Sequence, residues 1–107
     1  MLFRSSNWVK AAHASEFADG DVRGVELGDH NIAIYRVEDA FFATDNVCTH
    51  AFALLSDGFL DDCTIECPLH AARFDIRSGK VLSRPAEKDL ATYPVRIEGG
   101  EVLIDLA

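Results

Sequence analysis

The feature that most constrains this chain is a pair of short segments in which cysteine and histidine stand together. Cys48 and His50 form the first pair, and Cys67 and His70 form the second after 16 intervening residues. Thiolates and imidazoles are ligands of zinc and of iron–sulfur clusters, so two such pairs supply the four ligands of one metal centre. We therefore expect a fold that brings two loops, each carrying one cysteine and one histidine, to the same place.

Two kinds of metal centre compete for these ligands. A tetrahedral zinc site usually has two cysteines ~2 to 4 residues apart and two histidines ~3 to 5 apart, whereas each segment here is mixed. A 2Fe-2S cluster with two thiolates on one iron and two imidazoles on the other needs ligands at both ends of an elongated group. Two loops that each give one cysteine to the inner iron and one histidine to the outer iron meet that need. A structural zinc site without a redox role is the alternative.

The third cysteine, Cys63, precedes the second segment, and we expect it to be a small buried residue rather than a ligand. An odd number of cysteines in a chain without an apolar signal-peptide core makes a disulfide framework a poor explanation, and it points to the cytoplasm. The 107 residues correspond to one domain, 1–107.

The charge of the chain limits its partners. Ten Lys and Arg residues stand against 18 Asp and Glu, a formal net charge of −8. Such a field repels phosphate backbones and anionic lipids, so we expect neither nucleic acid nor a membrane surface as a partner. It would instead steer the chain toward a basic patch on another protein.

Short β-prone runs separated by turn residues predict an all-β fold, because no segment shows a long helical apolar stripe. The first half predicts a three-stranded meander, and the second half predicts two hairpins with turns at Ser78-Gly79 and Gly99-Gly100. One helical turn at Ser15–Ala18, capped by Ser15, is the only helix expected. The predicted strands are 22–27, 32–37, 41–43, 62–66, 74–76, 81–82, 95–98 and 102–106.

With these ligands and their order, the chain resembles the Rieske family, and specifically the small Rieske ferredoxins of bacterial aromatic-ring-hydroxylating dioxygenase systems. The resemblance covers nearly the whole chain. Besides the two ligand segments, it rests on Leu55–Gly58, Phe74-Asp75, Ser78-Gly79, Arg84–Ala86 and Tyr93–Val95.

The resemblance implies an antiparallel β-sandwich with a cluster-binding subdomain, capped by the two ligand loops and a third loop around Pro85. Cys48 and Cys67 would hold the buried iron of one 2Fe-2S cluster, and His50 and His70 the outer iron. The implied function is one-electron transfer from an FAD-containing, NAD(P)H-dependent ferredoxin reductase to a terminal Rieske oxygenase, with no catalytic site in this chain. The alternative is a Rieske-like small subunit of another system, such as nitrite reductase.

Two departures from the family and one residue beside the ligands carry expectations of their own. Ala51 and Ala71 follow the ligand histidines where the family usually has glycine, so we expect the loops to avoid backbone conformations that only glycine tolerates. Ala72 and Phe74 stand where respiratory Rieske proteins have hydroxyl donors to the cluster sulfurs, which predicts a low reduction potential. Phe52 is the largest of the apolar residues beside the ligands, and we expect it either to pack in its loop or to form a docking surface.

Overall fold

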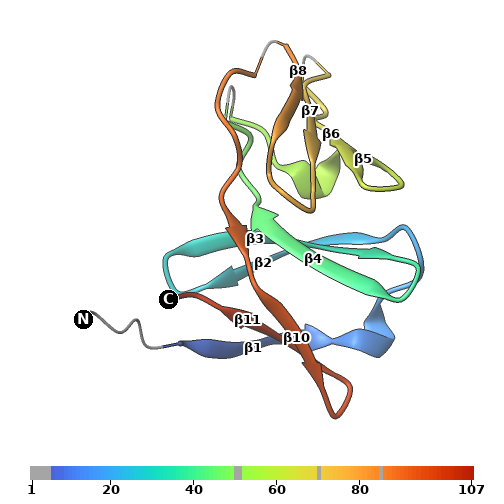
Figure 1. Cartoon of the computed structure of the whole chain (residues 1–107), viewed down its shortest axis with the longest axis vertical. Helices are drawn as coiled ribbons and strands as arrows, with labels where there is room; N and C mark the ends of the chain where they lie inside the picture. The colour runs from blue at the N-terminus through green and yellow to red at the C-terminus, as the bar shows by residue number, and fades with distance from the viewer. Residues whose placement is uncertain (1–5, 50–51, 70, 85) are drawn as a thin grey trace.

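The computed structural model describes residues 6–49, 52–69, 71–84 and 86–107, and these form three antiparallel sheets (Figure 1). Two sheets make the base of the molecule, and the third stands above them. The first base sheet has the order β2 (Val22–Leu27), β3 (His30–Val37), β4 (Ala40–Asp45) and β9 (Thr92–Tyr93), and the second has β1 (Trp8–His13), β11 (Glu101–Asp105) and β10 (Val95–Glu98). The upper sheet has the order β5 (Phe59–Asp61), β6 (Thr64–Glu66), β7 (Arg73–Asp75) and β8 (Val81–Ser83).

The expected all-β fold is confirmed, and so are the meander β2–β3–β4 and the hairpins β7–β8 and β10–β11. The helical turn differs from the prediction. It is a 3-10 turn, η1, over Ala14–Glu16, and its N-cap is His13 rather than Ser15. The Glu16 carboxylate accepts the backbone N–H of His13 at 2.9 Å, which satisfies a donor at the start of the turn.

Strand β3 is the centre of the fold because its two faces belong to two different cores. Ile32 and Ile34 pack with Val102 and Ile104 between the base sheets. Ala33 and Tyr35 point the other way, into a second core that lies beneath the upper sheet. Side chains alternate across a strand, so a continuous buried run is what a strand between two layers requires.

Residues 46–91, which we call the cluster subdomain, leave the base at the end of β4 and return to it at β9 (Figure 1). A second 3-10 turn, η2 (Leu55–Asp57), packs on β2 and β3 and connects the subdomain to the base. Leu55 is fully buried in the second core together with Tyr35. Across the described ranges, no helix has the length and apolar character needed to cross a membrane.

Candidate metal centre

The two cysteines predicted as ligands meet inside the cluster subdomain. Cys48 follows the end of β4 and Cys67 follows β6; both side chains are buried, with 4% and 1% exposed. Their thiols are joined by a hydrogen bond. The fold therefore brings together two sulfur atoms from segments that are 19 positions apart in the sequence.

Each of the two cysteines begins a loop that is closed by a main-chain hydrogen bond of the same pattern. The backbone N–H of Cys48 donates to the carbonyl of Ala53 at 2.9 Å, and that of Cys67 donates to the carbonyl of Ala72 at 2.7 Å. Each hydrogen bond closes a loop of six residues that starts with the buried thiol. The predicted ligands His50 and His70 fall within these two loops but lie outside the described residues, as do Ala51 and Pro85.

The local environment disfavours free thiolates. Burial raises the pKa of Cys67 to about 11; the backbone N–H of Leu69 donates to this sulfur and lowers the pKa, while the Cys48 thiol raises it again. Two adjacent buried thiols give up their protons readily only to a cation that replaces them. A pair of buried sulfur donors at the start of two equivalent loops fits the thiolate end of a 2Fe-2S cluster.

The surroundings of the thiols are apolar. Ala72 and Phe74 are fully buried in the same core as Cys48 and Cys67, at the positions where hydroxyl donors to the cluster were expected to be missing. The N–H of Leu69 is a main-chain donor to the Cys67 sulfur. Hydrogen bonds to cluster sulfurs raise the reduction potential of a cluster, and neither of these two side chains has a hydroxyl group to supply one.

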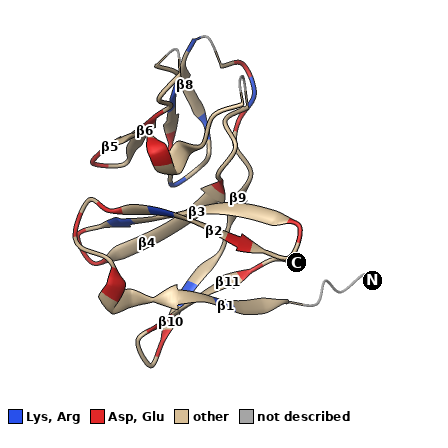
Figure 2. Ribbon diagram, turned by 180° about the vertical axis from the view of Figure 1, so that it is seen from behind, with Lys and Arg blue, Asp and Glu red and all other residues tan. Residues whose placement is uncertain are grey.

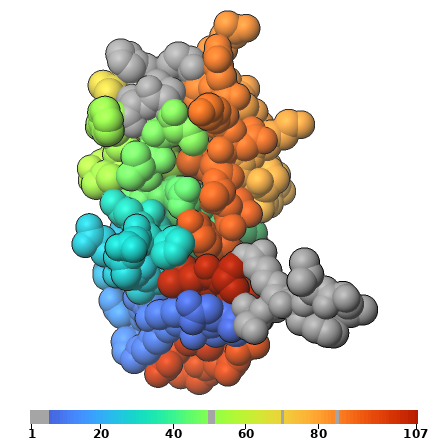
Figure 3. Space-filling view, turned by 90° about the vertical axis from the view of Figure 1, so that its left-hand side faces the viewer, coloured from blue at the N-terminus to red at the C-terminus, as the bar shows by residue number. Residues whose placement is uncertain are grey.

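A third segment, which follows β8, covers the first ligand loop. The Thr49 hydroxyl, between Cys48 and His50 in the sequence, donates to the carbonyl of Lys88 at 2.8 Å. Ala86 and Leu90 are buried in the core that holds both cysteines. In the space-filling view the segment after β8, in orange, lies alongside the first loop, in green (Figure 3).

One expectation about the loops is wrong. Ala71 has φ +58°, in the left-handed region that favours glycine, although the presence of alanine predicted that this region would be avoided. The hydrogen bond from Cys67 to Ala72 closes the loop just after this position. Closing the loop therefore outweighs the local preference of alanine, which costs ~1–2 kcal/mol in this conformation.

Cys63 stands apart from the other two cysteines. It lies in the turn before β6, is partly buried against the second core, and has a pKa raised by burial.

Asn46 and Ser56 were not predicted from the sequence as site residues, yet they flank the first loop on its two sides. An asparagine after a strand is an ordinary turn signal. Its hydrogen-bond partners lie too far away in the sequence for a local sequence pattern to reveal them.

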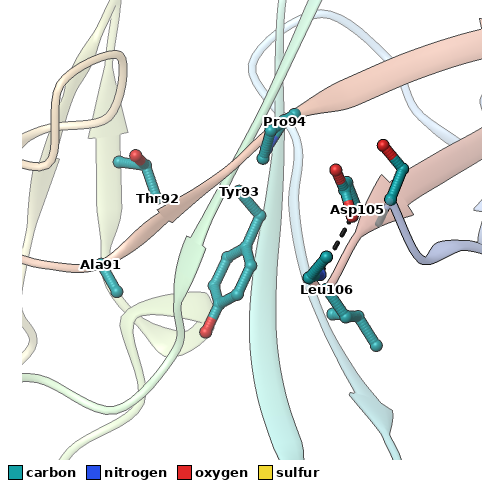
Figure 4. A pocket seen from close by; sticks show the side chains of 8 residues that line it. Ala91, Thr92, Tyr93, Pro94, Asp105 and Leu106 are labelled. Atoms are coloured by element: carbon teal, nitrogen blue, oxygen red, sulfur yellow. Dashed lines mark hydrogen bonds between the residues drawn. The ribbon is translucent and has the colours of Figure 1, made fainter. Parts of the chain in front are cut away.

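The pocket shown in Figure 4 lies away from the cysteines. It has a volume of about 480 Å³ and is formed by β9, Pro94 and the C-terminal end of β11. The Asp105 carboxylate on its wall accepts the backbone N–H groups of Asn7 and Ala107 at 2.8 and 2.9 Å. These contacts give the carboxylate a role in joining the two chain ends.

The chain belongs to the Rieske [2Fe-2S] domain family, whose profile matches residues 7–94. It is 48% identical over 102 residues to the ferredoxin component of the naphthalene 1,2-dioxygenase/salicylate 5-hydroxylase systems of Ralstonia sp, covering 95% of this chain and 98% of the relative. It is 41% identical over 101 residues to the 3-phenylpropionate/cinnamic acid dioxygenase ferredoxin subunit of Escherichia coli, covering 94% of each chain. The cofactor of this chain is therefore one 2Fe-2S cluster.

Solved structures agree with this family. The ferredoxin of Sphingomonas yanoikuyae B1 superposes with a TM-score of 0.89 at 38% identity, covering 94% of this chain and 100% of that one. The ferredoxin in a complex with the oxygenase of carbazole 1,9a-dioxygenase has a TM-score of 0.87 at 39% identity, with 92% of each chain covered. A structure described as a nitrite reductase small subunit from Mycobacterium tuberculosis has a TM-score of 0.87 at 23% identity, with 97% of this chain and 98% of that one covered, and shares the fold.

Proposed function

We propose that this chain is the ferredoxin component of an aromatic-ring-hydroxylating dioxygenase system. It carries one electron at a time from an FAD-containing, NAD(P)H-dependent reductase to a terminal Rieske oxygenase, and it works in the cytoplasm as a single domain, residues 1–107. The observation that carries this proposal is near end-to-end similarity to proteins named as ferredoxin components. The nitrite reductase alternative has less support, because that likeness extends to the fold alone.

Within the site, we assign Cys48 and Cys67 to the inner iron and His50 and His70 to the outer iron. The cluster supplies a one-electron couple that goes from a net charge of zero to −1 when the imidazoles are neutral. The protein buries the thiolate end and supplies a main-chain donor from Leu69. Because the neighbouring positions Ala72 and Phe74 carry no hydroxyl, we expect a potential at the low end of the Rieske range, about −150 mV. A redox titration that gave a value near the top of that range would contradict this reasoning.

Exposed apolar side chains occur in and beside both ligand loops. Phe52 is fully exposed, and Leu69, Val47 and Leu54 have 42%, 42% and 38% of their surface exposed. Val47 and Leu54 pair across the base of the first loop, while Leu69 belongs to the second. An exposed aromatic residue beside a redox centre loses contact with water only when a partner covers it. We therefore assign this apolar rim to docking of the oxygenase.

The distribution of charge supports docking through apolar contact. Residues 46–91 contain seven acidic and five basic side chains, a net charge of −2, so most of the net charge of −8 lies on the base. Figure 2 shows acidic residues along the turns of the two lower sheets. The negative field of the base influences how the protein approaches a partner at long range. The cluster subdomain is closer to neutral, so contact at that end depends less on charge.

A single substitution tests the docking surface. Phe52→Asp places a charge on the apolar rim and is expected to slow reduction of the oxygenase about tenfold or more, because a charge must then be desolvated in the interface. Electron transfer from the reduced protein to the terminal oxygenase of a naphthalene dioxygenase system is followed by stopped flow. Phe59→Asp is the matched control, since Phe59 is 65% exposed on the outer face of the upper sheet.

Electron paramagnetic resonance of the reduced protein completes the test. The spectrum of the Phe52→Asp variant should equal that of the unaltered protein, which shows that the cluster is intact. Equal rates for the Phe52 and Phe59 variants would reject docking at Phe52. A colourless protein containing zinc would overturn the proposed function as a whole.

A further inference from the structure

Asn46 is the single residue between the end of β4 and the paired position Val47 that leads into Cys48. Its side chain is 1% exposed, although asparagine is usually found at the surface. A buried amide is tolerated only when its donors and acceptors find partners. The contacts of Asn46 therefore show what this residue holds in place.

The Asn46 side chain is fully engaged. The backbone N–H of Ser56 donates to Asn46 Oδ1 at 2.8 Å, which fixes the orientation of the amide because an N–H can only donate. Asn46 Nδ2 then donates to Ser56 Oγ at 3.1 Å and to Asn31 Oδ1 at 3.0 Å. Asn31 stands at the start of β3, and Ser56 in η2, so one amide connects the base sheet to the chain after the first ligand loop.

The main chain of Asn46 repeats this connection. Its N–H donates to the carbonyl of Asn31 at 2.8 Å, and its carbonyl accepts the N–H of Leu55 at 2.7 Å. The first ligand loop thus leaves from Asn46 and returns to it. Asn46 therefore attaches both ends of the loop that carries Cys48 to the base sheet.

The second ligand loop is held in a different way. It connects β6 to β7, and the pair Glu66 and Arg73 continues the strand ladder directly beneath it. The first loop has only the isolated pair Val47 and Leu54 at the corresponding place. Asn46 therefore supplies for the first loop the attachment that a strand ladder gives the second.

Gly24 on β2 leaves the space in which the amide sits. A Cβ at this position would lie 2.7 Å from Asn46 Nδ2 and 2.9 Å from Ser56 Oγ, closer than real side chains approach. The backbone of Gly24 is not in a conformation reserved for glycine, so it is the missing side chain that matters here. The base sheet is thus shaped to receive this asparagine.

We propose that Asn46 is a positioning residue for the iron–sulfur cluster, which sets the place of Cys48 relative to Cys67, and that Gly24 provides the space it needs. The inference rests on the cluster as cofactor and not on the identity of the electron-transfer partners. Its failure would leave the proposed dioxygenase function standing. Conversely, a chain that serves another oxidoreductase would leave the inference intact.

The test uses the cluster-loaded protein and measures iron release to a chelator from the loss of visible absorbance. Asn46→Ala and Gly24→Ala are each expected to release iron about tenfold faster than the unaltered protein, as is typical when groups that orient metal ligands are removed. Each should also change the electron paramagnetic resonance spectrum and the reduction potential. Ser56→Ala removes only one acceptor and gives a smaller change in the same direction, so it serves if Asn46→Ala fails to fold.

Val25→Ala is the matched control. Val25 neighbours Gly24 on β2, but its side chain packs in the core between the base sheets. This variant lowers stability without changing the hydrogen bonds of Asn46, so its spectrum and reduction potential should be those of the unaltered protein. If Asn46→Ala and Gly24→Ala release iron at the rate of Val25→Ala with an unchanged spectrum, Asn46 has only a structural role and the proposal is overturned.

The double variant tests whether the two residues act together. Once Asn46 is alanine, the methyl group of Gly24→Ala no longer meets the amide nitrogen at 2.7 Å, and the Ser56 hydroxyl is free to turn away. The double variant should then release iron no faster than Asn46→Ala alone. Effects that multiply would show that Gly24 acts independently and would refute the shared role.

Discussion

The turn at Gly79 offers a quantitative test of how the third segment is held over the cluster. Gly79 has φ +77°, and a Cβ there would lie 2.2 Å from the carbonyl oxygen of Leu90. The carbonyl oxygen of Gly79 in turn accepts the N–H of Leu90 at 2.7 Å. Leu90 is buried with both cysteines, so any shift of its backbone disturbs the covering of the site.

Gly79→Ala should lower the free energy of unfolding in two ways. The left-handed backbone costs a non-glycine residue ~1–2 kcal/mol. Relieving the overlap with Leu90 requires the backbone to move, at ~1–3 kcal/mol. Gly28→Ala isolates the first contribution, because Gly28 has φ +62° and a Cβ there would have no neighbour within 4 Å.

The difference between the two variants corresponds to a melting temperature on the order of 10 °C lower for Gly79→Ala than for Gly28→Ala. Thermal unfolding of the cluster-loaded proteins, followed by far-ultraviolet circular dichroism at one heating rate, measures it. Equal losses in the two variants would refute the reasoning, because they would show that the contact with Leu90 contributes nothing.

Three further substitutions test local energetics. Tyr35→Phe removes a buried hydrogen bond of 2.8 Å to Thr44, whose hydroxyl keeps a bond to the next carbonyl, so urea unfolding should show a loss of ~0.5–1.5 kcal/mol. The Arg77 guanidinium holds the pKa of Asp75 below its usual value, so this pair stabilises the fold above about pH 4 and the stabilisation is lost on acidification. Asp75→Asn should therefore melt lower than the unaltered protein at pH 7 and approach it at low pH, and a constant gap would contradict the assignment. Ala71→Gly relieves the left-handed strain and should raise stability by up to about 1 kcal/mol, measured by urea unfolding; a loss would contradict the strain.

The sequence predicts those parts of the fold in which the pattern is local. The meander and the two hairpins follow from alternating residues and turn chemistry within short stretches. Strand β1 was not predicted, because its register shifts between Lys10 and Ala12 and its buried residues do not alternate. Strand β5 has three residues, which is too short for a period to be recognised, whereas strand β6 lies within the predicted strand 62–66.

The same distinction applies to the site. The sequence predicts Cys48 and Cys67 as ligands because metal chemistry demands particular side chains at close spacing, and the structure places both in one buried core. The residues that bring them together could not, because Asn46 reaches partners 15 and 10 positions away, at Asn31 and Ser56. Ordinary turn residues acquire their role only when the chain has folded.

Ala71 shows why even a correct family resemblance does not replace the structure. The resemblance implies that glycine is usual after the second histidine, and alanine there suggested a different backbone. The loop keeps the left-handed conformation all the same, since the hydrogen bond from Cys67 to Ala72 and the buried thiol next to it fix its path. A strain of ~1–2 kcal/mol is of the same order as one net hydrogen bond, so the burial of Cys67 and Ala72 must also hold the loop in place. Where residue preference and site geometry conflict in this protein, the geometry of the metal loops prevails.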